Sequence, residues 1–199
     1  MNALTESYSI VLAWQKELSG FSASMRDYLS FILRNPSNGE IVIKNVNQEN
    51  EVEINAIIKD VEVDILITSY PALILNFNQY NENIYDAINT VASIIFKKLE
   101  KIVDTIEVSY VGIYDINEDI FKIIKDNIGS IKLFPDMSPF SIRLYNANSH
   151  VIELLTIEPY ANLRKAVYTN YTARCKTLDI CINVSKKRIE EMVKYFEKM

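Results

Sequence analysis

The chain has 199 residues, of which 49% are hydrophobic and 24% are charged, and its formal net charge is −5. This composition excludes a disordered polymer and supports one substantial hydrophobic core or two small ones. The acidic balance argues against a protein that coats nucleic acid through its overall field. The apolar runs, such as PALILNF, are far shorter than the roughly 18–20 residues of a membrane helix, so no membrane span is predicted.

The N-terminal stretch MNALTESYSIVLAWQKE has no basic leader and no small-residue cleavage site, so no secretory signal is predicted. Cys175 and Cys181 are too few for a disulfide framework, which favours reduced thiols. We therefore expect a cytoplasmic protein.

The first predicted elements are ambiguous. Residues 7–14 alternate like a strand and residues 22–36 have the pattern of a helix. Residues 5–20 fit equally well a single helix that ends at Gly20, and local pattern does not decide between the two.

The middle of the first half is clearer. Alternating apolar and polar residues predict four antiparallel strands, with breaks at Lys59-Asp60 and Tyr70-Pro71; they are 40–46, 51–60, 61–70 and 72–80. A long helix then covers 81–104 because six apolar residues recur there at spacings of three and four, namely Ile84, Ile88, Val91, Ile95, Leu99 and Ile102.

The second half begins in the same way. A strand is predicted over 105–116, a helix over 118–129 that Gly129 ends, and further strands over 139–147 and 150–160. Residues 166–184 carry one or two more strands. Ser185 caps a final helix over 185–199, whose buried side is formed by Ile189, Met192, Val193 and Phe196.

Corresponding elements of the two halves lie about half the chain apart, as in a tandem duplication. The predicted fold is α+β: a mainly antiparallel sheet with helices on one face, built from two similar strand-helix-strands-helix halves. Because no linker separates residues 1–104 from 105–199, we expect one domain over 1–199 with internal pseudo-duplication and a shared sheet or core.

An acidic cluster at 115–126 resembles a calcium-binding loop, since Asp115, Asn117 and Asp119 alternate and Asp126 stands at the place of the last ligand. The sixth and eighth positions need Gly and an apolar residue, but they hold Ile120 and Lys122. A capped helix explains the cluster better, with Asn117 as the cap and acidic residues at the positive end of the helix dipole. No metal site is predicted.

Motifs for catalysis are missing from the sequence, including phosphate-binding loops, the nucleophile elbow and paired histidines. The one histidine, His150, is expected in a solvated turn between strands. If residues 173–184 form a strand, Cys175 and Cys181 share a face but are too far apart to bond, and Cys181 packs in the core. The protein is expected not to be an enzyme and to hold no cofactor, although a site assembled from distant residues is compatible with the sequence.

The most suggestive segment for ligand binding is 160–176, which mixes cations and tyrosines and has no acidic residue. Cations beside aromatic rings bind phosphates and stack on bases. The candidate ligand-binding residues are Arg164, Lys165, Tyr168, Tyr171, Arg174 and Lys176. The alternative is an ordinary solvated sheet face, since tyrosine is a good strand former.

Two resemblances concern the fold. The order of the elements resembles the saddle fold of the TATA-box-binding protein, without a matched stretch, so no DNA-contacting residue is carried over. The stretches IIFKKLEKIVDTIEVSYVGIYDIN, ending at Asn117, and LDICINV, starting at Leu178, resemble a sporadically distributed family of uncharacterised prokaryotic proteins. In that family a strand of the Leu-Asp-apolar type precedes the last helix. A basic residue stands there at the place where this chain has Gly112 and Ile113. The resemblance implies a fold and no known activity.

We therefore expect a non-catalytic binding or interaction protein, such as an adaptor, an inhibitor or a ligand-sensing domain, that uses an exposed strand edge or a groove. Its partner is expected to be another protein or a second copy of the chain, since the strands of the first half are acidic and the segment 160–176 is basic. The alternative for these charges is that they only keep the protein soluble. The alternative is nucleic-acid or nucleotide binding through 160–176. A hydrolase with an unrecognised carboxylate site ranks third.

Overall fold

The architecture comes from a computed structural model, which describes residues 2–14, 27, 41–47, 52–58, 60–67, 72–78, 84–100, 103–128, 140–161 and 163–198. The predicted helix at 22–36 lies outside these residues, apart from the helical Asp27. The elements follow in the order β1 (Asn2–Ala13), β2 (Ile41–Asn47), β3 (Val52–Ile58), β4 (Val61–Ile67), β5 (Ala72–Phe77), α2 (Ile84–Leu99), β6 (Thr105–Asp115), α3 (Ile120–Ile128), β7 (Ile142–Ala147), β8 (Val151–Pro159), β9 (Ala166–Cys175) and α4 (Leu178–Phe196).

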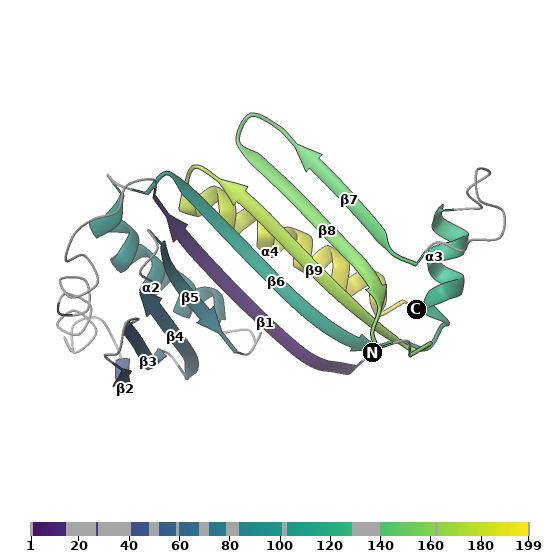
Figure 1. The fold of residues 1–199 in the computed structure, drawn as a ribbon, viewed down its shortest axis with the longest axis horizontal. Helices are drawn as coiled ribbons and strands as arrows, with labels where there is room; N and C mark the ends of the chain where they lie inside the picture. Colours follow the sequence, from purple (N-terminus) through teal and green to yellow (C-terminus); the bar gives the residue numbers. More distant parts are fainter. Residues whose placement is uncertain are drawn as a thin grey trace.

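The described strands form one nine-stranded sheet in the order β2-β3-β4-β5-β1-β6-β9-β8-β7, and every pairing is antiparallel. Strands β1 and β6 form the central pair, so the two parts of the chain share a continuous sheet (Figure 1). Strand β7 is the outermost of the described strands on one side. The predicted fold class, α+β with an antiparallel sheet, is confirmed.

Alternation explains why these segments are strands. In β5 and β6 every second residue is buried and the residues between are half-buried. Ile58 pairs with Val61, so β3 and β4 are paired up to the predicted break, where Asp60 has the left-handed φ of 63°. The ambiguity at the N-terminus is resolved up to Ala13, because residues 2–13 are a strand.

Helices α2 and α4 cover one face of the sheet (Figure 1). Tyr8 of β1 shows this directly: its ring meets the ring of Tyr85 in α2, and its hydroxyl group lies 2.9 Å from Ser185 Oγ in α4. The predicted apolar stripe of α2 is buried at Ile84, Ile88, Val91, Ile95 and Leu99. Helix α3 lies beyond the end of the long central strands (Figure 1).

The last helix begins earlier than the sequence predicted. Helix α4 starts at Leu178, so residues 178–184 are not a strand and Ser185 is not a cap. Ser185 is buried within the helix, where its hydroxyl group donates to Ile182 O at 2.9 Å. Ile189, Met192 and Phe196 are buried as predicted, and Val193 is half-buried against the core.

The tandem duplication stays a prediction. Four strands lie on the β1 side of the central pair (β2, β3, β4 and β5) and three on the β6 side (β9, β8 and β7). Within the helices that the structure describes, none is both long enough and apolar enough to cross a bilayer.

Candidate functional site

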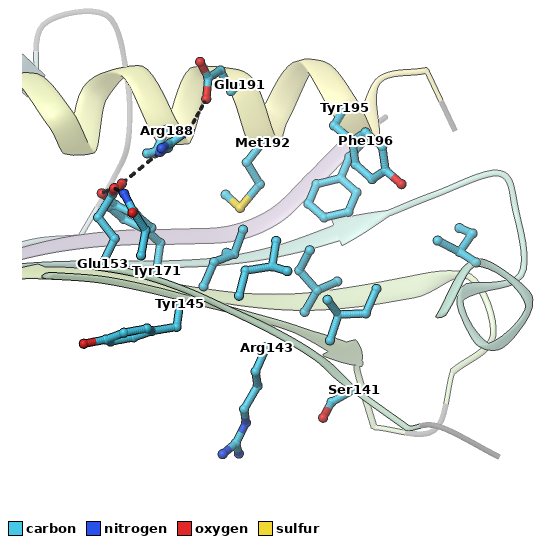
Figure 2. A pocket seen from close by; sticks show the side chains of 16 residues that line it. Ser141, Arg143, Tyr145, Glu153, Tyr171, Arg188, Glu191, Met192, Tyr195 and Phe196 are labelled. Carbon is cyan, nitrogen blue, oxygen red and sulfur yellow. Dashed lines mark hydrogen bonds and ion pairs between the residues drawn. The ribbon is translucent and has the colours of Figure 1, made fainter. Parts of the chain in front are cut away.

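The candidate site is a groove between the second half of α4 and the hairpin of β7 and β8. Its volume is about 890 Å3. Every residue from Ser141 to Asn146 borders it, so the groove follows the outer strand β7 along nearly its whole length. Helix α4 forms the opposite wall with Arg188, Glu191, Met192, Tyr195 and Phe196 (Figure 2).

The hairpin itself has a defined register. The Asn148 side chain accepts hydrogen bonds from the backbone N–H groups of His150 and Val151, both at 2.9 Å. His150 is exposed in this turn, as the sequence predicted. At the other end of β7, Phe140 packs on Phe121 of α3 with ring centroids 6.2 Å apart, which ties the start of the strand to that helix.

One end of the groove is polar and centred on Glu153 of β8, whose side chain is 8% exposed. Its Oε1 accepts hydrogen bonds from Arg188 Nε at 2.8 Å and from the Tyr171 hydroxyl group at 3.0 Å. Its Oε2 accepts one from Asn146 Nδ2 at 2.6 Å. Arg188 also donates through Nη1 to Glu191 Oε2 at 2.9 Å, so two carboxylates hold one guanidinium (Figure 2).

These contacts set the ionisation of the cluster. Burial raises the pKa of the Glu153 carboxyl, but hydrogen bonds from Arg188, Asn146 and Tyr171 outweigh burial, and the pKa lies below its usual value. Burial and the neighbouring Glu153 raise the pKa of Tyr171. Glu153 is therefore a carboxylate at neutral pH, and Tyr171 is a neutral hydrogen-bond donor.

The rest of the groove is apolar. Ile142 and Leu144 of β7 lie opposite Ile157 and Leu155 of β8 on the side that faces α4. Leu144 is 56% exposed although it belongs to the inward-facing set. The groove thus leaves accessible a surface that elsewhere in the sheet is covered by a helix.

The opposite side of the hairpin is apolar and exposed as well. Tyr145 pairs with Leu154, and Ile152 follows in the next row; their exposed fractions are 69%, 40% and 46%. Both faces of the outer strand are therefore accessible, in contrast to β6, where one face is buried throughout its central part.

The six candidate residues at 164–176 are divided by the structure. Arg164 and Lys165 lie in the turn before β9, whereas Arg174 and Lys176 lie at its far end, and ten residues of strand span about 30 Å. Tyr168 and Arg174 share the face turned away from α4, while Tyr171 points to α4 and binds Glu153. Only Tyr171 lines the groove.

Both arginines of that segment already contact carboxylates. Arg164 Nη1 lies 2.7 Å from Asp119 Oδ2, and Arg174 forms an ion pair with Glu107 on the neighbouring strand β6. The side chains of Arg164 and Arg174 are 77% and 64% exposed. Ligand binding by the six residues stays a prediction, since these contacts neither require nor prevent it.

The acidic cluster at 115–126 forms a helix start, although the cap differs from the predicted one. Asp119, and not Asn117, accepts a hydrogen bond from a backbone N–H of the first turn, that of Phe121 at 2.9 Å. Asp119 directly precedes Ile120, where α3 begins, so its side chain is within reach of the unpaired N–H groups. Arg164 takes up the other carboxylate oxygen.

A second Tyr–Glu cluster lies in the covered part of the same face. The hydroxyl groups of Tyr110 and Tyr114 lie next to each other, and each donates a hydrogen bond to Glu6 Oε1. Gly112 between them makes this possible, because a Cβ there would lie 2.6 Å from the ring of Tyr114. Tyr114 also packs on Phe196 at 5.8 Å between ring centroids, so the cluster joins β1, β6 and α4.

The two thiols do not share one strand, contrary to what the sequence suggested, because Cys181 belongs to α4; both are free and buried. Since residues 178–184 are helical, Cys181 points to the neighbouring strands β6 and β9, where its Sγ lies 3.7 Å from Ile106 O. Cys181 is fully buried and lies 3.3 Å from Ala173 O, which agrees with the predicted packing role. The neighbouring Cys175 side chain and burial raise the pKa of Cys181.

Sequence reasoning missed the groove, but one signal for it exists. Glu153 occupies the inward register of β8 together with Val151, Leu155 and Ile157. A carboxylate in an apolar register needs buried hydrogen-bond partners, and so it marks a site where other polar residues converge. Its partners Asn146, Tyr171 and Arg188 come from three other elements and carry no local pattern.

No protein-family model matches the chain, and a search of curated proteins found no significant match. The resemblances in element order therefore remain predictions.

Proposed function

We propose that this protein is a non-catalytic interaction domain that binds an extended segment of another polypeptide along β7. The observation that carries the proposal is the course of the groove, which is bordered by every residue from Ser141 to Asn146 of the outermost strand. A ligand that fills this groove lies against the free edge of the sheet.

The edge supplies the backbone part of the binding. Strand β7 pairs with β8 on one side and has no neighbour on the other among the residues that the structure describes, so we take the row of N–H and C=O groups on that side as the edge for an added strand. Protected edges commonly carry prolines, bulges or inward-pointing charges. Strand β7 has none of these: its sequence is IRLYNA, its pairing with β8 is regular, and its inward-facing residues are Ile142, Leu144 and Asn146.

The groove supplies the side-chain part. In an added strand every second side chain points to the α4 side. Those side chains would enter the space between Leu144 on the strand and Met192 and Tyr195 on the helix, which are groove residues. Binding by strand addition uses this combination, with affinity from the backbone and specificity from alternate side chains.

A displayed library of random ten-residue peptides, selected on the purified chain, tests the proposal. The variant is Leu144→Lys, which places a charge in the groove, and its matched control is Leu163→Lys in the turn before β9. The two leucines are similarly exposed, at 56% and 53%. We expect selected peptides to bind the control like the original chain and to lose at least tenfold in affinity with Leu144→Lys. No enriched peptide, or equal loss with both variants, would overturn the proposal.

A second copy of the chain is the alternative occupant of the edge. Light scattering distinguishes the two occupants. A dimer that becomes a monomer with Leu144→Lys but not with Leu163→Lys would show that a second copy of β7, and not a foreign peptide, occupies the edge. We also propose that the protein is cytoplasmic, as the sequence led us to expect.

Nucleic-acid binding through 160–176 ranks second. Replacement of Arg164, Lys165, Arg174 and Lys176 by Ala should lower any measured affinity for single-stranded DNA and reduce its salt dependence if the hypothesis holds. Unchanged affinity and salt dependence would remove it.

A further inference from the structure

The two faces of β7 differ in charge, and this difference constrains the sequence of a bound strand. On the α4 side the groove contains two carboxylates, Glu153 and Glu191, and one guanidinium, Arg188, so its net charge there is −1. Lys187 lies 3.9 Å from Glu191 but is 74% exposed and does not border the groove. On the other face, Arg143 points away from α4 (Figure 2) and forms no ion pair among the residues that the structure describes.

The strand register fixes which partner residue meets which charge. Glu153 lies opposite Asn146, so a residue added opposite Asn146 occupies the next place in the same row on the α4 side. It is two strand spacings, about 10 Å, from Glu153. The side chain of a lysine or arginine is long enough to reach the Glu153–Glu191 end of the groove from there, and the unused carboxylate charge favours a cation.

The neighbouring rows of the sheet favour other residue types in the bound strand. Arg143 pairs with Thr156, so the residue added opposite Arg143 extends a row on the other face that holds one positive charge. An acidic residue is the complement there. Residues opposite Ile142 and Leu144 enter the apolar part of the groove, and the residue opposite Tyr145 extends the exposed Leu154–Tyr145 row.

We infer, on the basis of the proposed function, that the bound strand runs antiparallel to β7 and carries the pattern basic, aromatic or apolar, apolar, acidic, apolar in its own chain order. The antiparallel direction continues the pairing of every described strand in the sheet. In this direction the basic residue lies opposite Asn146 and the acidic residue opposite Arg143. The bound strand thus carries its one basic residue on the face toward α4 and its one acidic residue on the opposite face.

Three synthetic nonapeptides of equal composition test the pattern, with central residues Lys-Tyr-Leu-Glu-Val, Glu-Tyr-Leu-Lys-Val and Val-Glu-Leu-Tyr-Lys and flanking threonines. The first matches the inferred strand, the second exchanges the charges, and the third reverses the direction. Fluorescence anisotropy should give the first peptide an affinity about tenfold above the other two at low salt, and less at high salt. The Arg143→Glu variant should bind a peptide with central residues Lys-Tyr-Leu-Lys-Val, in which Lys replaces Glu, more tightly than it binds the first peptide.

The outcomes separate this inference from the proposed function. Equal binding of the three peptides, or an Arg143→Glu variant with unchanged preference, would overturn the charge pattern while Leu144-dependent peptides from the library still support strand addition. If the library gives no Leu144-dependent peptide, both fail. Preference for the reversed peptide would overturn the antiparallel direction, and with it the inference as stated, but it would leave the proposed strand addition standing.

Discussion

Strands β6 and β7 belong to one sheet and have similar alternating sequences, yet their surroundings differ. In β6 every second residue is buried from Ile106 to Tyr114, under α4 and beside β1 and β9. In β7 the inward residue Leu144 is 56% exposed and the outward residue Tyr145 is 69% exposed. The difference teaches that position in the sheet, and not the strand pattern, decides whether an apolar face forms the core or a surface for a partner.

The largest expected effect comes from replacing a leucine by alanine, once in the covered centre of the sheet and once in β7. Leu12→Ala in β1, the strand beside β6, should lower the free energy of unfolding by about 2–5 kcal/mol, because Leu12 is completely buried. Leu144→Ala should change it by less than about 0.5 kcal/mol, since the side chain is largely solvent-accessible already. Urea unfolding of the two variants measures both values, and similar losses would contradict the distinction between core and edge.

Gly112→Ala sharpens the comparison within β6. The new Cβ would lie 2.6 Å from the Tyr114 ring and 2.9 Å from the Tyr110 hydroxyl oxygen, and both rings are buried. The overpacking should cost about 1–3 kcal/mol. Thermal unfolding checks this, with Ser109→Ala on the other face of β6 as the control. A Gly112→Ala variant as stable as the control would show that the two rings are free to move apart.

Glu153 joins the core to the groove, and the loss of its charge should have a smaller effect than either core substitution. Glu153→Gln weakens the hydrogen bonds from Arg188, Asn146 and Tyr171, at a cost of about 1–2 kcal/mol at neutral pH. The folded-state pKa of Glu153 is below the usual value of 4.5, so its contribution is full above that pH and is lost as the pH falls through the folded pKa.

Unfolding measured at several pH values between neutral and about pH 3 tests this sign, because the difference between the original chain and Glu153→Gln should shrink toward acid. A difference that stays constant or grows on acidification would mean that Glu153 is not held as a carboxylate by its neighbours.

The sequence predicted the strands well, since alternation in stretches such as VEVDILI and TIEVSYVGIYD reports a sheet with one buried face. It failed at residues 178–184, where LDICINV alternates like a strand. There, Leu178, Cys181, Ile182 and Ser185 are buried at helical spacing, and the apolar Ile180 is 38% exposed. Packing on β9 and β6 overrides the strand preference of the branched residues.

The groove was not predictable from local pattern. It depends on β7 being the outermost described strand on its side and on α4 packing over β9 and β6, and both are consequences of sheet order. The same holds for the segment 160–176, whose composition suggested one cluster although β9 holds its cations at two ends. Residues that are near each other in the sequence lie far apart in space when an extended strand connects them.

Amide hydrogen exchange of β7, with and without the tightest peptide from the displayed library, tests the central claim most directly. Strand addition predicts that amides of residues 142–147 on the open side exchange at least tenfold more slowly when the peptide is bound, while those of β6 are unchanged. Protection elsewhere in the molecule, with β7 exchanging as before, would contradict the assignment of this edge as the binding surface.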